Sequence, residues 1–427
     1  MGQAVNQELA IDSGRLQESL SELGAIGAFD SEYEGVIGVR RLALSDEDAA
    51  GRRLVVGWFE QAGLEVAVDQ IGNVYATRAG AEAGLAPLMS GSHVDSVPTG
   101  GRFDGALGVL GALEVVRTLN DRSIATRRPI TIGFFTDEEG CRFGTDMLGS
   151  AVATGRISLS HAWSLADASG LTVRGELERI GFLGDEAVGQ RRPHAFVECH
   201  VEQGPVLRHD RLDLGVVTGV QGISWQRVTI TGAPAHAGTT PTQFRRDAGL
   251  VAAKINVGLR EMCESGKYGP EMRATMGVIR PEPGSVNVIP GRVVATVDLR
   301  NPSDEGMAWA EADLRAFCNG LASESEVTIE FERTARTDAV VFDEGVQSTI
   351  AAVASELDLR HRGILAGAGH DAQEWSSVCP TAMIFTPGEN DGISHNPREF
   401  STPKQCADGI NTLLHTILAL DRDGDGS

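Results

Sequence analysis

Residues 86–119, APLMSGSHVDSVPTGGRFDGALGVLGALEVVRTL, hold the stretch that decides the fold. Residues 86–94 predict a buried strand, because a short apolar run there ends in a segment rich in glycine and proline. Residues 105–119 predict a helix whose small side chains allow close packing. Further buried strands are expected within 128–139 and 194–204. Such alternation of strand and helix favours an α/β fold, in which helices cover a central sheet.

The middle of the chain has a different pattern. Strands are expected at 224–232, 275–290, 291–300 and 326–336, and helices at 245–264 and 307–321. The resulting βαββαβ order is the ferredoxin-like, split βαβ arrangement of a small α+β domain. We therefore expect an inserted domain at residues 217–335 and a discontinuous first domain made of residues 1–216 and 336–427. The last residues, DRDGDGS (421–427), are expected to form an irregular tail.

Composition excludes several classes of function. A chain of 427 residues favours two domains, and 41% hydrophobic with 22% charged residues is typical of a soluble protein. The net charge of -22 argues against a nucleic-acid partner, because phosphate binding needs clustered Lys and Arg. No window approaches about 18 uninterrupted apolar residues, so no membrane span is expected, and the start carries no secretory signal. Six scattered cysteines without a CxxC pair suit reduced thiols, so we expect a cytoplasmic protein.

Candidate metal ligands stand at the ends of the predicted strands, where α/β sheets gather their ligands. His93 lies at the end of the strand at 86–94, and Asp104 directly precedes the N-terminus of the helix that follows. Imidazole and carboxylate are natural ligands for zinc, manganese or cobalt. Asp95, two residues after His93, is expected to accept the other ring N–H and so select the tautomer.

Two adjacent acids, Glu138 and Glu139, follow the strand within 128–139. Like charges so close are unfavourable unless a cation or a shared proton compensates for them. Adjacent residues point in different directions from an extended backbone. One carboxylate can therefore bind metal while the other serves as general acid and base. His200, in HVEQG, and His395, in GISHNP, each lie in a glycine-containing loop after an apolar strand.

Together these motifs resemble the M20 metallopeptidase clan and, within it, the hydantoinase/carbamoylase branch. The resemblance runs from about Leu44 to Pro403. It is carried by GSHVDSVPTGGRFDGALG, TDEEGCRFG, HVEQGPVL, GAPAHAGTTPTQFRRDA, GSVNVIPG, VDLR, GAGHDAQ and GISHNPREFS. It implies a mixed-sheet, dinuclear-metal hydrolase domain with an inserted lid and dimerisation domain.

The resemblance also implies roles for the candidate ligands. Asp104 would bridge two divalent ions, with His93 and His200 at one and Glu139 and His395 at the other. The ions would be Zn2+, or Mn2+, Co2+ or Ni2+. Glu138 would be the general base, and the peptide bond after Asp104 is commonly cis in this family. His200 is informative, because the peptidase and deacylase branches usually carry a carboxylate there.

The remaining implied residues concern the substrate. His236 would reach the active site of a partner subunit in a homodimer and stabilise the oxyanion. Asn287 and Arg300 would hold a substrate carboxylate, and Gln203 the ureido or carboxylate end. His370 and Asp95 would support the ligands without binding metal.

The implied reaction is hydrolysis of an N-carbamoyl group, and the favoured hypothesis is an N-carbamoyl-L-amino-acid hydrolase. Allantoate amidohydrolase, β-ureidopropionase and ureidoglycolate amidohydrolase share nearly all these residues and stay open as alternatives. A peptidase or deacylase of the same clan, or a catalytically silent metal-binding protein, is less favoured.

Overall fold

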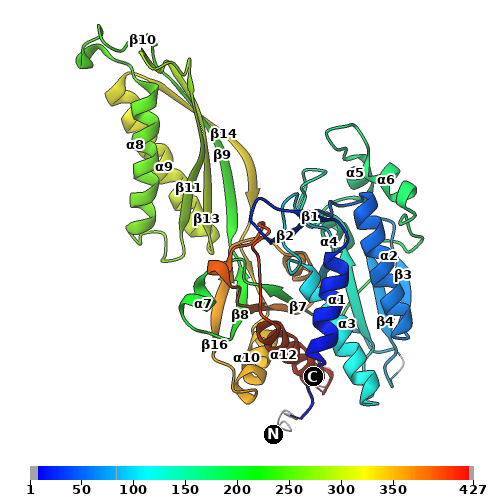
Figure 1. The fold of residues 1–427 in the computed structure, drawn as a ribbon. Helices are drawn as coiled ribbons and strands as arrows, with labels where there is room; N and C mark the ends of the chain where they lie inside the picture. Colours follow the sequence, from blue (N-terminus) through cyan, green and yellow to red (C-terminus); the bar gives the residue numbers. More distant parts are fainter. Residues whose placement is uncertain (1–7, 83, 423–427) are drawn as a thin grey trace. The chain divides into compact units, whose positions relative to one another are not determined.

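The computed structural model describes residues 8–82 and 84–422 (Figure 1). The chain divides into two compact units, Met1–Thr218 with Phe342–Ser427, and Gly219–Val341. The tail expected to be irregular lies outside the described residues from 423 onward. Within the described part of the chain, no helix is long and apolar enough to cross a membrane.

The first unit is built on a large mixed sheet, which confirms the predicted α/β class. Its parallel centre consists of β17 (Thr381–Thr386), β7 (Ala195–Val201), β5 (Leu88–His93) and β6 (Ile130–Phe135), in this spatial order. Every residue of these four strands is buried, as expected for the parallel centre of an α/β sheet. The outer strands are β3 (Glu65–Val68), β4 (Val74–Arg78), β8 (Leu214–Val220) and β16 (His361–Ala366). The short β15 (Val340–Val341), at the end of the second unit, pairs with Gly219 and Val220 at the end of β8.

Helix α3 (Ala106–Asp121) is the helix predicted after the first strand, and it packs tightly on the sheet. Its glycines make the close approach possible. A Cβ on Gly108 would lie 2.5 Å from the carbonyl oxygen of Cys199 in β7, and one on Gly111 would lie 2.1 Å from Ile410 in α12 (Pro403–Arg422). Because α3 begins directly after Asp104, its packing also fixes where this carboxylate lies.

The other elements of the first unit surround this core. They are α1 (Ser13–Gly24), the hairpin of β1 (Ala28–Asp30) and β2 (Ile37–Val39), α2 (Asp46–Gln61), α4 (Leu148–Thr154), α5 (Leu159–Ser164), α6 (Val173–Ile180), α7 (Val206–His209), α10 (Glu344–Glu356), α11 (Asp371–Trp375) and η2 (Asn390–Gly392).

The second unit is a four-stranded antiparallel sheet covered on one face by two helices (Figure 1). Its main elements follow in the order β9 (Gly222–Thr231), α8 (Ala248–Glu264), β11 (Arg273–Glu282), β13 (Arg292–Asn301), α9 (Asp304–Ser325) and β14 (Thr328–Thr337). The strands lie in the order β11-β13-β9-β14. Alternating residues of β13 are buried against the helices, as expected for a sheet with one solvated face. A short ladder of β10 (Ala235–His236) and β12 (Val288–Ile289), and η1 (Thr242–Phe244), complete the unit.

Candidate metal centre

The candidate site lies at the carboxyl ends of the parallel strands. His93 is the last residue of β5, His200 is the last but one of β7, and Glu139 follows β6 after a short turn. Neighbouring parallel strands end at the same edge of a sheet, so these side chains from distant parts of the sequence meet there.

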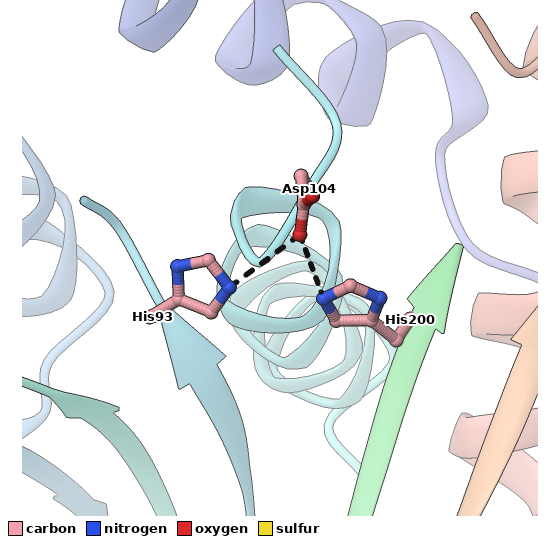
Figure 2. Close-up of side chains that lie close together, drawn as sticks. All are labelled: His93, Asp104 and His200. Atoms are coloured by element: carbon pink, nitrogen blue, oxygen red, sulfur yellow. Dashed lines mark ion pairs between the residues drawn. The ribbon is translucent and has the colours of Figure 1, made fainter. Parts of the chain in front are cut away.

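Three buried side chains form the first group of potential ligands. The Nε2 atoms of His93 and His200 lie 3.5 Å and 3.1 Å from Oδ1 of Asp104. Figure 2 shows the two rings approaching the carboxylate from either side, each at the tip of its strand. Two imidazole nitrogens and a carboxylate oxygen around one point are a donor set that suits a divalent transition metal.

Main-chain carbonyls orient both rings. Nδ1 of His93 lies 3.0 Å from the carbonyl oxygen of Asp95, and Nδ1 of His200 lies 2.9 Å from that of Val201. A carbonyl oxygen only accepts, so each Nδ1 carries a proton, and in the neutral ring the lone pair of Nε2 faces the centre. The amide of Gly105 donates to Nε2 of His200 at 3.1 Å, which agrees with this tautomer.

The expected role of Asp95 needs a correction. Its carboxylate is 3.8 Å from Nδ1 of His93, so the main-chain carbonyl, rather than the side chain, accepts the ring N–H. The turn after β5 brings that carbonyl closer to the ring. The carboxylate instead accepts the backbone N–H groups of Glu138 and Glu139, both at 3.4 Å. Asp95 therefore supports the two adjacent glutamates as well as His93.

A second group shares Asp104. Nε2 of His395 lies 3.4 Å from Oδ2 of Asp104 and 3.2 Å from Oε2 of Glu139. The two oxygens of Asp104 thus face different groups, the arrangement that a bridging carboxylate needs. Gln203, expected to orient substrate, donates from Nε2 to Oδ2 of Asp104 at 2.9 Å.

The charges around these residues favour a cation. Burial by itself would lower the pKa of His93, but the surrounding carboxylates, Glu138 foremost, raise it well above its ordinary value. Burial would likewise raise the pKa of Asp104, yet hydrogen bonds from the three histidines hold it well below its usual range. When no ion is bound, the carboxylates therefore favour a second proton on each ring, at Nε2, and a divalent ion would take the place of that proton.

Unsatisfied donor atoms support the same interpretation. Among the described residues, Oε1 of Glu139 and Oε1 of Gln203 are buried without a hydrogen-bond partner, as is Nε2 of His370. The His370 ring packs edge-on against that of His200 at 4.7 Å, and its Nδ1 bonds to the carbonyl of Ala368 at 3.1 Å. Buried polar groups without partners are costly, so these atoms fit a site that holds ions and substrate.

Glu138 lies beside the ligand groups without belonging to either. Its Oε2 is 3.5 Å from Nε2 of His93, and the side chain is almost completely buried. Burial raises the pKa of Glu138 well above its usual range, although His93 opposes the shift. A carboxyl with a raised pKa in such a place is suited to take and return a proton.

The expected cis bond after Asp104 is not found. In the described chain the cis peptide bond is Glu282–Pro283. The turn into α3 is made instead by Gly105, with φ 64° and ψ -48°. Glycine reaches positive φ without the clash that a Cβ would create, so this turn needs no cis bond.

Two residues beside the site were missed by the sequence analysis. Oε1 of Glu399 accepts the backbone N–H groups of Phe103 and Asp104, each at 3.0 Å. The hydroxyl of Ser394 lies 2.9 Å from Oδ2 of Asp104 and 2.7 Å from Oε2 of Glu399. Both belong to the quoted GISHNPREFS motif, and their position around His395 was the signal that could have identified them.

The three residues expected to contact substrate from the insert do not all lie together within the second unit. His236 and Asn287 are neighbours: His236 pairs with Val288 across the β10–β12 ladder, and the carbonyl of Asn287 accepts the N–H of Ala237 at 2.9 Å. Arg300 lies at the far end of β13 and pairs with Asp298 at 3.1 Å. The other end of β13, Arg292, pairs with Thr231, the end of β9 that leads towards His236. The strand from 292 to 300 is about 27 Å long.

Comparisons with known proteins identify the family of this chain. The family model "Peptidase family M20/M25/M40" matches residues 89–419. The N-carbamoyl-L-amino-acid amidohydrolase of Rhizobium meliloti is 40% identical over 97% of this chain and 98% of its own length. The allantoate amidohydrolase of Bacillus subtilis is 31% identical over 90% and 93%. The crystal structure of a hydantoinase/carbamoylase family amidase from Burkholderia multivorans is 43% identical, with a TM-score of 0.93, covering 97% of this chain and 99% of that one.

Proposed function

The chain belongs to the M20/M25/M40 peptidase family, in its hydantoinase/carbamoylase branch, and we propose that it hydrolyses the N-carbamoyl group of an N-carbamoyl-L-amino acid. The products would be the free amino acid, carbon dioxide and ammonia. The observation that carries the proposal is the pair of ligand groups sharing Asp104, with a histidine, His200, rather than a carboxylate beside His93. The similarity to carbamoylases over nearly the whole chain supports the same substrate class.

Two divalent ions would be held by His93, Asp104 and His200, and by Asp104, Glu139 and His395. When bound, such ions polarise the scissile carbonyl and lower the pKa of an attacking water towards neutrality. Histidine and carboxylate ligands suit Zn2+, Mn2+, Co2+ or Ni2+, and the metal taken in the cell depends on its availability.

Glu138 is the proposed general base. Its Oε2 takes the proton of the attacking water and delivers it to the leaving nitrogen. Its raised pKa favours the second half of this task, because a carboxyl with a higher pKa holds the proton more readily until the proton is transferred. His236 is proposed to stabilise the oxyanion that forms on the carbamoyl group.

Arg300 and Asn287 are proposed to bind the substrate carboxylate. The planar guanidinium of Arg300 can make two parallel hydrogen bonds to a carboxylate, in place of its pairing with Asp298. Gln203, already bonded to Asp104, would direct its unpartnered oxygen to the ureido group.

A homodimer is part of the proposal. His236 and Asn287 lie beyond the Arg292 end of β13, which is about 27 Å along the strand from Arg300. A small N-carbamoyl amino acid cannot bridge that distance, so Arg300 of one chain would act with His236 and Asn287 of another. The insert would serve as the lid and dimerisation domain. Light scattering should give the mass of two chains, and a fully active monomer would refute this arrangement.

Allantoate and ureidoglycolate stay as alternative substrates, because similar chains are named for each of them. N-carbamoyl-β-alanine stays as a third alternative on the family resemblance alone. The six cysteines are free, which supports a cytoplasmic location.

The deciding experiment is an ammonia assay. The metal-stripped chain is reloaded with each ion in turn and offered N-carbamoyl-L-amino acids, N-carbamoyl-D-amino acids, allantoate, N-carbamoyl-β-alanine and dipeptides. The proposal expects the highest kcat/KM on an N-carbamoyl-L-amino acid. Preference for dipeptides, followed by release of free amino acids without ammonia, would overturn it.

A further inference from the structure

Glu399 is a buried carboxylate whose described hydrogen bonds all come from neutral donors. Its side chain is 7% exposed. Oε1 accepts two consecutive backbone N–H groups, of Phe103 and Asp104, and Oε2 lies 2.7 Å from the hydroxyl of Ser394. A carboxylate buried without a cation is costly unless its oxygens are well satisfied. The three hydrogen bonds to Glu399 offset this cost, but they do not explain why a carboxylate is buried at this position.

The contacts of Glu399 join two distant loops. One loop carries Asp104, the other carries His395 directly after Ser394, and 295 positions separate Glu399 from Asp104. The Ser394 hydroxyl also reaches Oδ2 of Asp104 at 2.9 Å, the oxygen that faces His395. Glu399 thus sets both the backbone of the bridging aspartate and the loop of a ligand to the second ion.

The chain leaves space for this carboxylate at Gly101. A Cβ on Gly101 would lie 2.6 Å from Cβ and 2.7 Å from Oε1 of Glu399. An alanine there would push Glu399 away from the two amides while leaving its charge intact. Gly101 and Glu399 are therefore coupled through one contact.

We propose that Glu399 is a positioning residue of the metal centre, which aligns Asp104 with His395 so that the two ligand groups can share one carboxylate. It touches neither ion nor substrate. This inference rests on the proposed function, because it presumes that ions bind at Asp104. Residues that orient metal ligands commonly change metal affinity by about 10–100-fold when removed.

The test measures metal affinity rather than turnover. The stripped chain and its variants are titrated with Co2+, whose visible absorption reports both binding and ligand geometry. Glu399→Ala is expected to weaken binding by about 10–100-fold and to alter the Co2+ spectrum. Glu399→Gln is expected to bind within a few-fold of the original chain. Its amide oxygen can still accept the two N–H groups, and its amide nitrogen can donate to Ser394.

Asp421→Ala is the matched control. Asp421 is also buried and also accepts two consecutive backbone N–H groups, those of Arg127 and Arg128, each at 2.8 Å. It lies at the end of α12 and is absent from the contacts of the ligand groups described above. Its loss should lower the melting temperature comparably, without changing the Co2+ affinity or spectrum.

Gly101→Ala provides a second, independent variant should Glu399→Ala fold poorly. It should weaken Co2+ binding as Glu399→Ala does. Original affinity and spectrum in both variants, or equal loss of affinity in Asp421→Ala, would overturn the positioning role. Failure of the original chain to bind Co2+ would overturn the metal centre itself. Co2+ binding without any ammonia release would contradict only the proposed reaction.

Discussion

Replacing Glu138 by glutamine separates chemistry from metal binding. Glutamine has nearly the same shape, and Glu138 belongs to neither ligand group, so both ions should stay. The amide cannot take the water proton. Loss of a general base lowers kcat by about 10²–10⁴-fold, which corresponds to about 2.7–5.4 kcal/mol of transition-state stabilisation. The structure favours the upper part of this range, because the adjacent carboxylate, Glu139, is engaged with His395.

Stability should not fall in this variant. Burial and the nearby acids Asp371, Glu139 and Asp104 all raise the pKa of Glu138, so the ionised side chain is electrostatically unfavourable in the chain without ions. Removing its charge should therefore leave the melting temperature of the stripped protein unchanged or higher. A large fall would show that the side chain is structural.

The assay pairs Glu138→Gln with Glu139→Gln, the same substitution one residue along. Glu139→Gln removes a predicted ligand and should reduce metal content towards one ion per chain. Metal content is measured by emission spectrometry and kcat by ammonia release at saturating substrate. A metal-replete Glu138→Gln variant with kcat within tenfold of the original would refute the base assignment. So would loss of an ion from this variant.

Three further predictions concern stability. Gly105→Ala should destabilise the chain by roughly 2–5 kcal/mol in urea unfolding, because the positive φ opposes a side chain and the new Cβ would lie 2.4 Å from the His93 ring. Chelation should lower the melting temperature, and restored metal at 100 times Kd should return about 2.7 kcal/mol; equal melting curves with and without chelator would contradict this. Burial lowers the pKa of His415, whose Nε2 bonds to the carbonyl of Leu9 at 2.9 Å. The native state then binds fewer protons than the unfolded state. The stability linked to the neutral His415 ring is therefore fully present above pH 6.5 and is lost as the pH falls. His415→Gln should flatten the fall in melting temperature between about pH 7 and 5.

Local patterns predicted the elements that carry the site. The strands expected at 86–94, 128–139 and 194–204 are β5, β6 and β7, and the intervening helix is α3. These were predictable because a fully buried strand reads as a short apolar run and α3 is marked by its small residues. The structure also brings the five predicted ligands into two groups that share Asp104, although their binding of metal stays a prediction.

Contacts that depend on the path of the chain in space were harder to predict from the sequence. The partner of His93 was expected to be the Asp95 carboxylate, but a difference of 0.8 Å favours the main-chain carbonyl of the same residue. Sequence spacing cannot resolve such a difference, because it depends on the path of the turn. Glu399 was overlooked because the two backbone N–H groups that it accepts lie almost 300 positions away.

The sequence by itself determined which chemical groups end each buried strand, since apolar runs, glycines and the acids after them are local features. It therefore sufficed for the fold class, the donor types and the family resemblance. Only the tertiary structure decided that Asp104 presents one oxygen to each group and that Glu399 joins the two loops. It also placed Arg300 at one end of β13 and His236 in a separate short ladder beyond the other end of that strand. Each of these facts depends on positions in space that residues far apart in the chain acquire only by packing together, so no short stretch of sequence encodes them.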